Sequence, residues 1–457
     1  MNDTMLREAM ERFARVCAQV DVHGMMVSVG GETRARVYWE PFREGQPHRM
    51  YSVSKSLVSL AIGMLAGDGR IRLDDPIVDY FPEWVDGHTH PMLREVTIRN
   101  MLMMSTCYDR AMYSPLGDRD WTRPFFYGEP THPAGTLFHY DTSASQVMCA
   151  LVEKLTGGEI LSFLEERLFR PLGMDGRKRW LKDGTGTSQG GTGLLMTLRD
   201  FSRLADYCMS DGRGLVPEGY LRDATSRLIA TEERSAPEER HGYGYQFWRM
   251  RRGFSMYGMG GQMGLCMPEE GLSLCTTGNT MLSAVGVQPI YDGFFRHLAG
   301  IGSLPSDPHD AQELSDRLAT LALPPVTPAN AQEGVRRIRF TRTELPFTAL
   351  TIRPEAVVFR MADGDAALPY AVGGWAEGIF PATCERCVTS AAWTEEDRFV
   401  LRCEVKDSFI CSMEMVVSFR GERGAVRVSG ALWELTPGWN GLAWGAADAC
   451  AQGPDGL

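Results

Sequence analysis

YSVSKSLVSLAIGMLAGDG, residues 51–69, is the stretch of the sequence that decides the fold. Its apolar residues recur at steps of three and four, the spacing of one face of an α-helix. They are Leu57, Leu60, Ala61, Met64 and Leu65. The GDG at 67–69 ends the pattern, because glycine favours the end of a helix. We therefore expect a helix that begins beside a cluster of three serines and one lysine.

Ser52 and Lys55 are three residues apart in this stretch. On a helix, residues three apart share a face, whereas adjacent residues point about 100° apart. Ser52 can therefore present its oxygen to the lysine, and Ser54 and Ser56 cannot. A serine hydroxyl becomes a good nucleophile when a base takes its proton. Lys55 can be that base if burial or a positive neighbour lowers its pKa from about 10.4.

The same spacing fits a helix-capping serine beside a solvated lysine, so the pattern alone leaves both interpretations open. Two further observations bear on it. The S-x-x-K pattern occurs once, since none of the other four lysines has a serine three residues before it. A serine in the first turn of a helix also has a backbone N–H that the helix leaves unsatisfied and that can bind an oxyanion.

The composition is that of an ordinary globular protein. The 457 residues are 44% hydrophobic and 23% charged, with a formal charge of −11. This acidic balance, without a long basic run, argues against nucleic acid or an anionic membrane surface as the main partner. A small-molecule or short peptide-like substrate is the better expectation.

Cellular location is indicated by what the chain lacks. The first 20 residues do not have the pattern of a secretory signal, and no segment approaches the roughly 18 to 20 apolar residues needed to span a bilayer. Eleven cysteines, an odd number, favour reduced thiols over a disulfide framework. We therefore expect a cytoplasmic protein.

Strand and helix patterns divide the first 300 residues into three parts. Residues 25–39 predict two strands joined by a Gly-Gly turn, and residues 70–235 predict mainly helices and long loops. Strand patterns then return, at 243–248, 255–267 and 272–278. A final helix is expected at 282–299. This order predicts an α/β (α+β) domain at 1–305, with an antiparallel sheet built from both ends, flanking helices and a helical insertion.

A second domain follows a segment rich in proline, aspartate and alanine, which we assign as a linker at 306–335. Beyond it, alternating runs separated by Gly, Asp and Pro predict antiparallel strands. They include VRRIRF, TALTIR, RFVLRCEV and SMEMVVSFRG. We expect a small all-β domain at 336–457. Whether it braces or caps the site, forms a contact in a homo-oligomer or does neither is left open.

HRMYSVSKSLVSLAIGMLAGDGRIRLDDPIVDYFPEW, residues 48–84, closely resembles the active-site segment of the serine β-lactamase and penicillin-binding-protein superfamily, particularly its esterase and amide-hydrolase branch. Further segments resemble this superfamily in the same order along the chain. They include 96–108, 132–157, 167–176 and 255–262. The resemblance covers roughly residues 20–300 and implies a β-lactamase/transpeptidase-like fold for the first domain.

The resemblance implies a mechanism through an acyl-enzyme. Ser52 would be the nucleophile, with Lys55 as the base. Tyr140-Asp141-Thr142 occupies the place of the second motif, Tyr-x-Asn or Tyr-x-Ser, so Tyr140 would carry a proton to the leaving group and, as phenolate, activate water later. Thr142 matches the motif only as a hydroxyl that would orient substrate. Without the resemblance, Tyr140 would be interpreted as a core aromatic with a hydrogen-bonded hydroxyl.

The third motif of the family, Lys-Thr-Gly, supplies a positive group for a substrate carboxylate. The corresponding strand here, SMYGMGGQ at 255–262, has no lysine or histidine before Gly258, which argues against β-lactamase or carboxypeptidase activity. By similarity, the backbone N–H groups of Met259 and Ser52 would be the two oxyanion donors. Three neighbours would line the substrate: Gly258, Gly260 and Gln262. The glycines also fit a bulged edge strand.

The resulting hypothesis is a serine hydrolase for a small ester or amide, similar to esterases and to the hydrolases of aminoalkanoate oligomers, with no cofactor and no metal. Three alternatives stay open. The same site could have β-lactamase or D-amino-acid peptidase activity, or it could transfer the acyl group to an acceptor other than water. The fold could also be a non-catalytic binding module.

One rival nucleophile is Ser188, in the sequence GTSQG at 186–190, which fits G-x-S-x-G. The nucleophile elbow of α/β-hydrolases needs an apolar strand immediately before this motif and a helix immediately after it. The preceding residues are LKDGTGT, and the next helix is expected only near Thr197. We therefore expect no nucleophile at Ser188.

A rival metal site would use Cys384 and Cys387, a lone C-x-x-C that Cys403 and Cys411 could complete. The second pair lacks the tight spacing of a zinc ribbon, so neighbouring strand cysteines are the favoured interpretation. The sequence has no H-E-x-x-H and no P-loop pattern.

Overall fold

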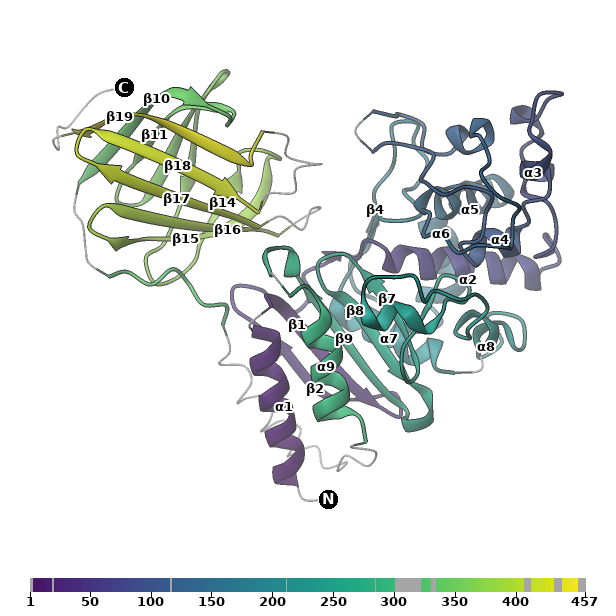
Figure 1. Ribbon diagram of the computed structural model, residues 1–457. Coiled ribbons are helices and arrows are strands. Elements are labelled where there is room, and N and C mark those ends of the chain that lie inside the picture. Colours follow the sequence, from purple (N-terminus) through teal and green to yellow (C-terminus); the bar gives the residue numbers. More distant parts are fainter. Residues whose placement is uncertain are drawn as a thin grey trace. The chain divides into compact units, whose positions relative to one another are not determined.

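Figure 1 shows a computed structural model of the chain. It describes residues 3–18, 20–115, 117–210, 212–283, 285–300, 322–329, 334–406, 412–430 and 438–450. The chain divides into two compact units, 1–321 and 322–457. Most of the linker predicted at 306–335 lies outside the described residues, so the domain limits 1–305 and 336–457 stay predictions.

The first unit contains a six-stranded sheet with the strand order β2-β1-β9-β8-β7-β6, in which all neighbours are antiparallel. The strands are β1 (Val22–Val29), β2 (Glu32–Tyr38), β6 (Trp248–Arg249), β7 (Phe254–Gly258), β8 (Gln262–Met267) and β9 (Leu272–Gly278). Because β1 pairs with β9, the two ends of the unit share one sheet. This confirms the predicted antiparallel sheet.

Helices cover the faces of this sheet. α1 (Asp3–Ala18) and α9 (Gln288–Gly293) lie side by side (Figure 1), and α7 (Leu198–Cys208) packs against β1, β8 and β9. Accordingly, β9 is buried along its whole length. The final helix begins at Gln288 rather than at 282 and continues as a π-helical turn, Phe294–Leu298.

α2 (Val53–Gly67) follows β2, and the residues between α2 and β6 form the expected helical block. The helices of this block are α3 (Pro91–Arg94), α4 (Ile98–Leu102), α5 (Thr142–Thr156), α6 (Ile160–Leu164) and α8 (Tyr220–Ala224), besides α7. The block also has 3-10 helices, at Ile77–Tyr80, Pro82–Trp84, Arg123–Tyr127 and Pro237–His241, and a π-helix at Glu165–Phe169. Two further 3-10 helices lie outside the block: Pro268–Glu270 follows β8, and Thr280–Leu282 follows β9. A small sheet, β3 (His48–Arg49), β5 (Leu194–Met196) and β4 (Arg179–Trp180), was not predicted.

α2 differs from the amphipathic helix that its sequence predicts. Every residue from Val53 to Leu65 is buried, including three serines and Lys55. The reason is the position of the helix, which packs against α5, α6 and β7. The helix ends at Gly67 with Asp68 as its C-cap, and Gly69 follows with φ 69°, in the left-handed region that favours glycine. The packing of α2 therefore buries the one lysine that the S-x-x-K pattern contains.

The second unit is all-β, as predicted. Ten strands form one antiparallel sheet in the order β13-β12-β11-β10-β19-β18-β17-β16-β15-β14, and the edge strands β13 and β14 contact each other, so the sheet is barrel-like. The strands are β10 (Val335–Thr343), β11 (Phe347–Ile352), β12 (Ala356–Met361), β13 (Gly364–Pro369), β14 (Ala376–Phe380), β15 (Glu385–Glu395), β16 (Arg398–Val405), β17 (Ser412–Arg420), β18 (Arg423–Ser429) and β19 (Gly441–Cys450). Alternate residues of β17 and β18 point into a core that includes Phe347, Phe359 and Trp439.

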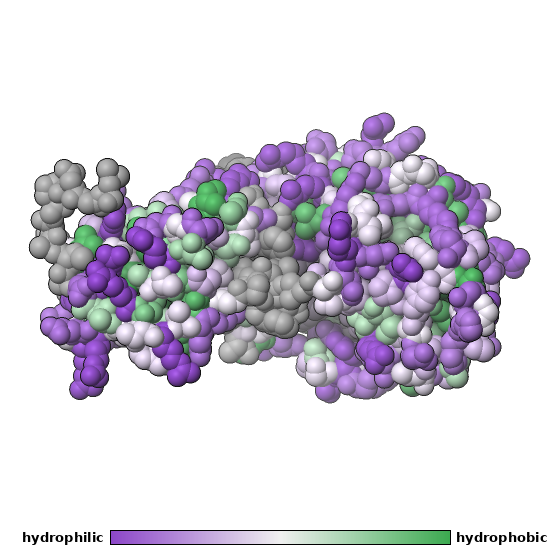
Figure 2. All heavy atoms as spheres, turned by 90° about the horizontal axis from the view of Figure 1, so that it is seen from above, coloured by the Kyte–Doolittle hydropathy of each residue, from purple (hydrophilic) through white to green (hydrophobic). Residues whose placement is uncertain are grey.

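The surface is polar over much of the face shown in Figure 2, with smaller hydrophobic groups between the polar ones. The large apolar side chains that are exposed include Tyr127, Leu137, Leu228 and Trp444. Among the helices of the described residues, none has both the length and the apolar character needed to cross a membrane.

Candidate active site

Ser52 lies at the start of α2, where it is the N-cap residue with φ −67° and ψ −8°. Its side chain makes no capping hydrogen bond, so its oxygen is not committed to the helix backbone. The preceding residue, Tyr51, has φ 45°, a conformation uncommon for a residue with a side chain. Such backbone strain is often kept at functional sites. Here it occurs at the turn that places Ser52.

Lys55 lies one helical turn further on and is 1% exposed. Its Nζ donates hydrogen bonds to Ser52 Oγ at 3.1 Å and to the backbone oxygen of Gly191 at 2.9 Å. Burial lowers the pKa of Lys55 to about 7, although the charge of Asp141 acts in the opposite direction. The contact predicted from the three-residue spacing is therefore present, and the lysine is available as a neutral amine near pH 7.

Tyr140 completes a cluster of three side chains. Lys55 Nζ lies 5.0 Å from the centre of its ring, and a hydrogen bond with Ser52 acts on its hydroxyl. The ring stacks on Trp248 with centroids 5.4 Å apart and planes 22° apart. Burial raises the pKa of Tyr140 above its ordinary value, more than the hydrogen bond with Ser52 lowers it. Tyr140 is therefore a neutral phenol near pH 7. This does not favour the second function expected from the sequence, in which Tyr140 as a phenolate activates water.

Asp141 and Thr142 follow at the start of α5. Asp141 is fully buried and accepts a hydrogen bond from the backbone N–H of Ser143 at 2.7 Å, which caps the helix. Thr142 lies against Gly191: a Cβ on that glycine would be 2.3 Å from Thr142 Cγ2 and 3.0 Å from Lys55 Nζ. Because Gly191 has no side chain, its backbone can lie close to the side chains of Thr142 and Lys55.

The β7–β8 hairpin borders the same site. A Cβ on Gly258 would lie 2.1 Å from the backbone oxygen of Met50, so only glycine fits there. Gly260 and Gly261 form the turn with φ 82° and 88°. Gln262 is buried, and its Nε2 donates to the backbone oxygens of Met259 and Gly278 at 3.2 and 2.8 Å. The geometry of Gln262 therefore favours support of the hairpin over direct contact with substrate.

Comparison with known proteins bears on these positions. A model of the β-lactamase family matches residues 3–288, which is more than half of the chain. The chain belongs to the β-lactamase family. The β-lactamase/transpeptidase-like fold expected for the first domain is thereby confirmed. The functions of the individual site residues stay predictions.

The chain is also similar to individual proteins of this fold, at sequence identities of 25% and 16%. The chain is 25% identical over 254 residues to 6-aminohexanoate-dimer hydrolase from Paenarthrobacter ureafaciens, a match that covers 50% of this chain and 63% of that protein. The match thus spans less than two thirds of the relative. Among solved structures, EstCE1, described as a hydrolase with promiscuous acyltransferase activity, is 16% identical with a TM-score of 0.52, covering 64% of this chain and 99% of EstCE1.

The structure of SurE is 16% identical with a TM-score of 0.52, and the match covers 92% of this chain and 95% of SurE. Because the first unit is 321 of 457 residues, this match extends into the β unit. At such identities the likeness shows the fold alone.

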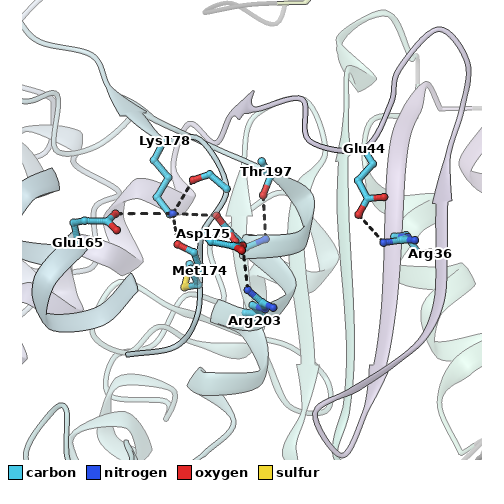
Figure 3. Close-up of polar contacts among 10 residues, drawn as sticks. Arg36, Glu44, Glu165, Met174, Asp175, Lys178, Thr197 and Arg203 are labelled. Atoms are coloured by element: carbon cyan, nitrogen blue, oxygen red, sulfur yellow. Dashed lines mark hydrogen bonds and ion pairs between the residues drawn. The ribbon is translucent and has the colours of Figure 1, made fainter. Parts of the chain in front are cut away.

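A second buried lysine of this β-lactamase-family chain gives a useful contrast. Lys178 Nζ lies 3.1 Å from Asp200 Oδ2 and also donates to the backbone oxygens of Met174 and Gly176 at 2.5 and 2.9 Å. Figure 3 shows it between Glu165 and the start of α7. Lys178 is a structural cation that forms an ion pair with the buried carboxylate of Asp200. Lys55 instead contacts a hydroxyl and a carbonyl, which is the environment that suits a base.

Two serines and a glutamine support the site, and sequence reasoning did not assign their roles. Ser54 Oγ accepts from the backbone N–H of Leu194 at 3.1 Å, and Ser56 Oγ donates to the backbone oxygen of Gln246 at 2.8 Å. The Gln246 side chain accepts from Ser145 Oγ and donates to the backbone oxygens of Met101 and Leu102. Gln246 therefore ties α2, α4 and α5 together.

The strand predicted at 243–248 is wrong for most of its length, because only Trp248 belongs to a strand. Gln246 has φ 66°, and its groups bond to helices rather than to a neighbouring strand. In the sequence, a glutamine within a run of aromatic residues was the sign that a buried polar side chain could lie at this position.

The described residues of the two rival sites are placed as follows. Ser188 is fully buried, forms an isolated bridge with Lys182, and is followed by a helix only at Leu198, so the strand–elbow–helix arrangement is absent from this part of the described chain. Cys384, Cys387 and Cys403 are free thiols, and Cys411 lies outside the described residues. The described ranges hold no group of three or more His, Cys, Asp or Glu side chains placed for a metal ion.

Proposed function

We propose that this protein is a serine hydrolase that cleaves a small ester or amide through an acyl-enzyme on Ser52. The observation that carries the proposal is the 3.1 Å contact between Ser52 Oγ and Lys55 Nζ. Burial lowers the pKa of Lys55 to about 7, and a base whose pKa lies near the working pH is effective in proton transfer. A capping serine beside a solvated lysine would have neither the contact nor the burial.

In the acylation step, Ser52 Oγ forms a bond to the carbonyl carbon of the substrate while its proton moves to Lys55 Nζ. The carbonyl electron pair moves to the oxygen, and the backbone N–H groups of Ser52 and Met259 bind this oxyanion. The oxyanion then collapses and the bond to the leaving group breaks. The leaving group takes a proton from the hydroxyl of Tyr140, which regains one from the Lys55 ammonium.

In the deacylation step, neutral Lys55 accepts a proton from water as the water oxygen bonds to the acyl carbon. Collapse of the second oxyanion breaks the bond to Ser52 Oγ, which recovers its proton from Lys55, and the acid leaves. The burial that raises the pKa of Tyr140 supports Lys55, rather than a Tyr140 phenolate, as the base for water. An alcohol or amine in place of water would receive the acyl group, which is the acyltransferase alternative.

An aromatic cluster beside Tyr140 supports a substrate with an apolar part. Met104, Tyr243 and Trp248 are buried at its centre, and Phe138, Tyr140, Ile229 and Tyr257 are half-buried around them. The half-buried rings leave apolar surface next to the proposed proton donor. The hydrolase activities in the names of the curated relative and of EstCE1 fit an amide or ester substrate.

Labelling with a fluorophosphonate probe tests the proposal, because such probes react with activated serines. We expect labelling of the wild-type protein and its loss in Ser52→Ala. Ser188→Ala is the matched control, since it removes the hydroxyl of the rival G-x-S-x-G motif and should leave labelling unchanged. Wild-type protein that stays unlabelled while folded would favour the non-catalytic binding module. Loss of labelling in Ser188→Ala alone would move the nucleophile to that residue.

A hydrolysis screen would narrow the range of possible substrates. It would compare short-chain p-nitrophenyl esters, nitrocefin and D-amino-acid amides, first with water and then with added alcohol or amine acceptors. The absence of a lysine or histidine before Gly258 leads us to expect ester or simple amide turnover above nitrocefin turnover. Faster turnover of nitrocefin or of D-amino-acid amides would support the β-lactamase or peptidase alternatives instead.

A further inference from the structure

Asp141 is the buried charged residue of the site that the proposed mechanism leaves without a function. Its Oδ1 accepts the capping hydrogen bond from the N–H of Ser143. Its Oδ2 is buried and has no hydrogen-bond partner in the part of the chain that the structure describes. A buried carboxylate oxygen without a partner is costly. Capping alone does not explain it, because asparagine or serine caps a helix equally well.

The side chains of both chain neighbours of Asp141 lie near Lys55. The ring centre of Tyr140 is 5.0 Å from Lys55 Nζ. Thr142 Cγ2 and Lys55 Nζ both lie within 3.0 Å of the position that a Cβ on Gly191 would occupy. Asp141 is thus held beside the lysine by its two chain neighbours and by the helix cap.

The two charges act on each other. The Lys55 charge lowers the pKa of Asp141, whereas burial raises this pKa to about 6. The Asp141 charge raises the pKa of Lys55, against the larger effect of burial, which lowers it to about 7. Both groups therefore titrate near neutral pH, where a change in the charge of either is felt by the other.

Other titratable groups near Asp141 are neutral in this range. Burial and the Asp141 charge raise the pKa values of Cys107, Tyr108 and Tyr113, which lie on the loop after α4. Arg49 acts on Tyr113. The charged and titratable groups that act on Tyr140 are Arg234 and Glu239, which form an ion pair, and Tyr257. During the proposed acylation, the charge that changes beside Asp141 is the charge of Lys55.

We propose that the Asp141 carboxylate is a positioning residue that stabilises the ammonium formed when Lys55 takes the proton of Ser52. The inference rests on the proposed function and deepens it. The step creates a positive charge on a buried amine, which burial disfavours. A carboxylate already fixed beside this amine offsets that cost without having to reorganise. Asp141 acts through Lys55 and does not touch the substrate.

Asp141→Asn tests the inference because asparagine keeps the helix cap and the shape of the side chain but removes the charge. The measurement is the rate of fluorophosphonate labelling, or kcat/KM for a p-nitrophenyl ester, as a function of pH. We expect the apparent pKa of the acidic limb to fall by about one unit or more, since an opposite charge nearby shifts a pKa by roughly 1 to 3 units. The plateau rate should fall roughly tenfold or more.

Three further variants separate charge from structure. Asp141→Ser is a second neutral cap and should behave like Asp141→Asn, whereas Asp141→Glu keeps the charge and should stay closer to the wild-type pH profile. Glu83→Gln is the matched control: it removes a carboxylate that is paired with Lys154 at the surface. Its pH profile and plateau should not change.

Folded Asn and Ser variants with the wild-type pH profile would overturn the inference and leave Asp141 as a helix cap. Failure of both neutral variants to fold, while the Glu variant folds, would also overturn it, because the charge would then serve folding rather than proton transfer. A wild-type protein that reacts with neither probe nor ester would count against the proposed function itself.

Discussion

Gly258 and Met50 are in backbone contact: a Cβ on Gly258 would lie 2.1 Å from the Met50 carbonyl oxygen. Met50 is two residues before Ser52, and Gly258 is followed by Met259. This contact therefore sets the distance between the two backbone segments that we propose as donors to the oxyanion. It is an instance of close backbone approach that requires glycine, here at the last residue of β7.

Gly258→Ala should separate these segments. Because the alanine methyl meets a backbone oxygen, the hairpin or the turn before α2 must move, and we expect kcat/KM for an ester substrate to fall by roughly 10². Gly87→Ala is the control, since a Cβ there has nothing within 4 Å. Steady-state kinetics on both variants, with thermal unfolding as a check of folding, measure the effect. Unchanged kcat/KM in a folded Gly258→Ala would contradict the proposed place of Met259.

The activity should depend on pH through Lys55. Burial lowers the pKa of Lys55 to about 7, and the neutral amine is the proposed base, so kcat/KM should rise as pH rises through about 7 and be lost on the acidic side. Lys55→Met should lower acylation by roughly 10² to 10⁴, the usual contribution of a general base. Lys182→Met changes a surface lysine paired with Glu159 and should leave the profile intact. A flat profile through neutrality would remove Lys55 from the mechanism.

Gln246→Ala should destabilise the first unit. The change removes the partner of Ser145 Oγ and the donor to the backbone oxygens of Met101 and Leu102. Because each buried polar group left without a partner costs about 1 to 3 kcal/mol, the free energy of unfolding should fall by about 3 kcal/mol or more. Urea unfolding measures the loss. Gln288→Ala, at a half-buried position paired with Asp292, is the control and should cost about 1 kcal/mol or less.

Lys178→Met should also destabilise the protein, because it leaves the fully buried Asp200 carboxylate without its cation. Breaking a buried ion pair from one side typically costs about 3 to 5 kcal/mol. The double change Lys178→Met with Asp200→Leu should recover much of this loss, since no charge is then left unpaired. Lys154→Met, at a surface pair with Glu83, should cost about 1 kcal/mol or less. Equal losses for Lys154 and Lys178 in urea unfolding would contradict this account.

The features predicted from the sequence are those set by local geometry. The three-residue spacing of Ser52 and Lys55 on a helix allows the contact that the structure shows, and Gly30 with Gly31 turns β1 into β2 with φ 61° and 82°. Tyr140 was found only through the family resemblance, since helix or strand periodicity does not connect residue 140 with residue 52. Its position beside Lys55 depends on tertiary packing.

The missed features depend on burial from several elements at once. The sequence of α2 gives one apolar face, but its serines and Lys55 are buried because α5, α6 and β7 also pack on the helix. Gln246 lies in a run of aromatic residues that suits a strand, and its hydrogen bonds to α4 and α5 prevent one. Strands of two residues, such as β3 and β4, are too short to have a period.

The pairing of β1 with β9 has a consequence for how the protein folds. β1 lies between β2 and β9 in the sheet, so its second neighbour comes from a segment more than two hundred residues later in the chain. Contacts so distant in sequence slow folding, because a long loop must close before they stabilise anything. During synthesis, Ser52 would leave the ribosome well before the hairpin that completes its surroundings. A nascent chain that stops before residue 258 should therefore contain Ser52, the proposed nucleophile, and still lack hydrolase activity.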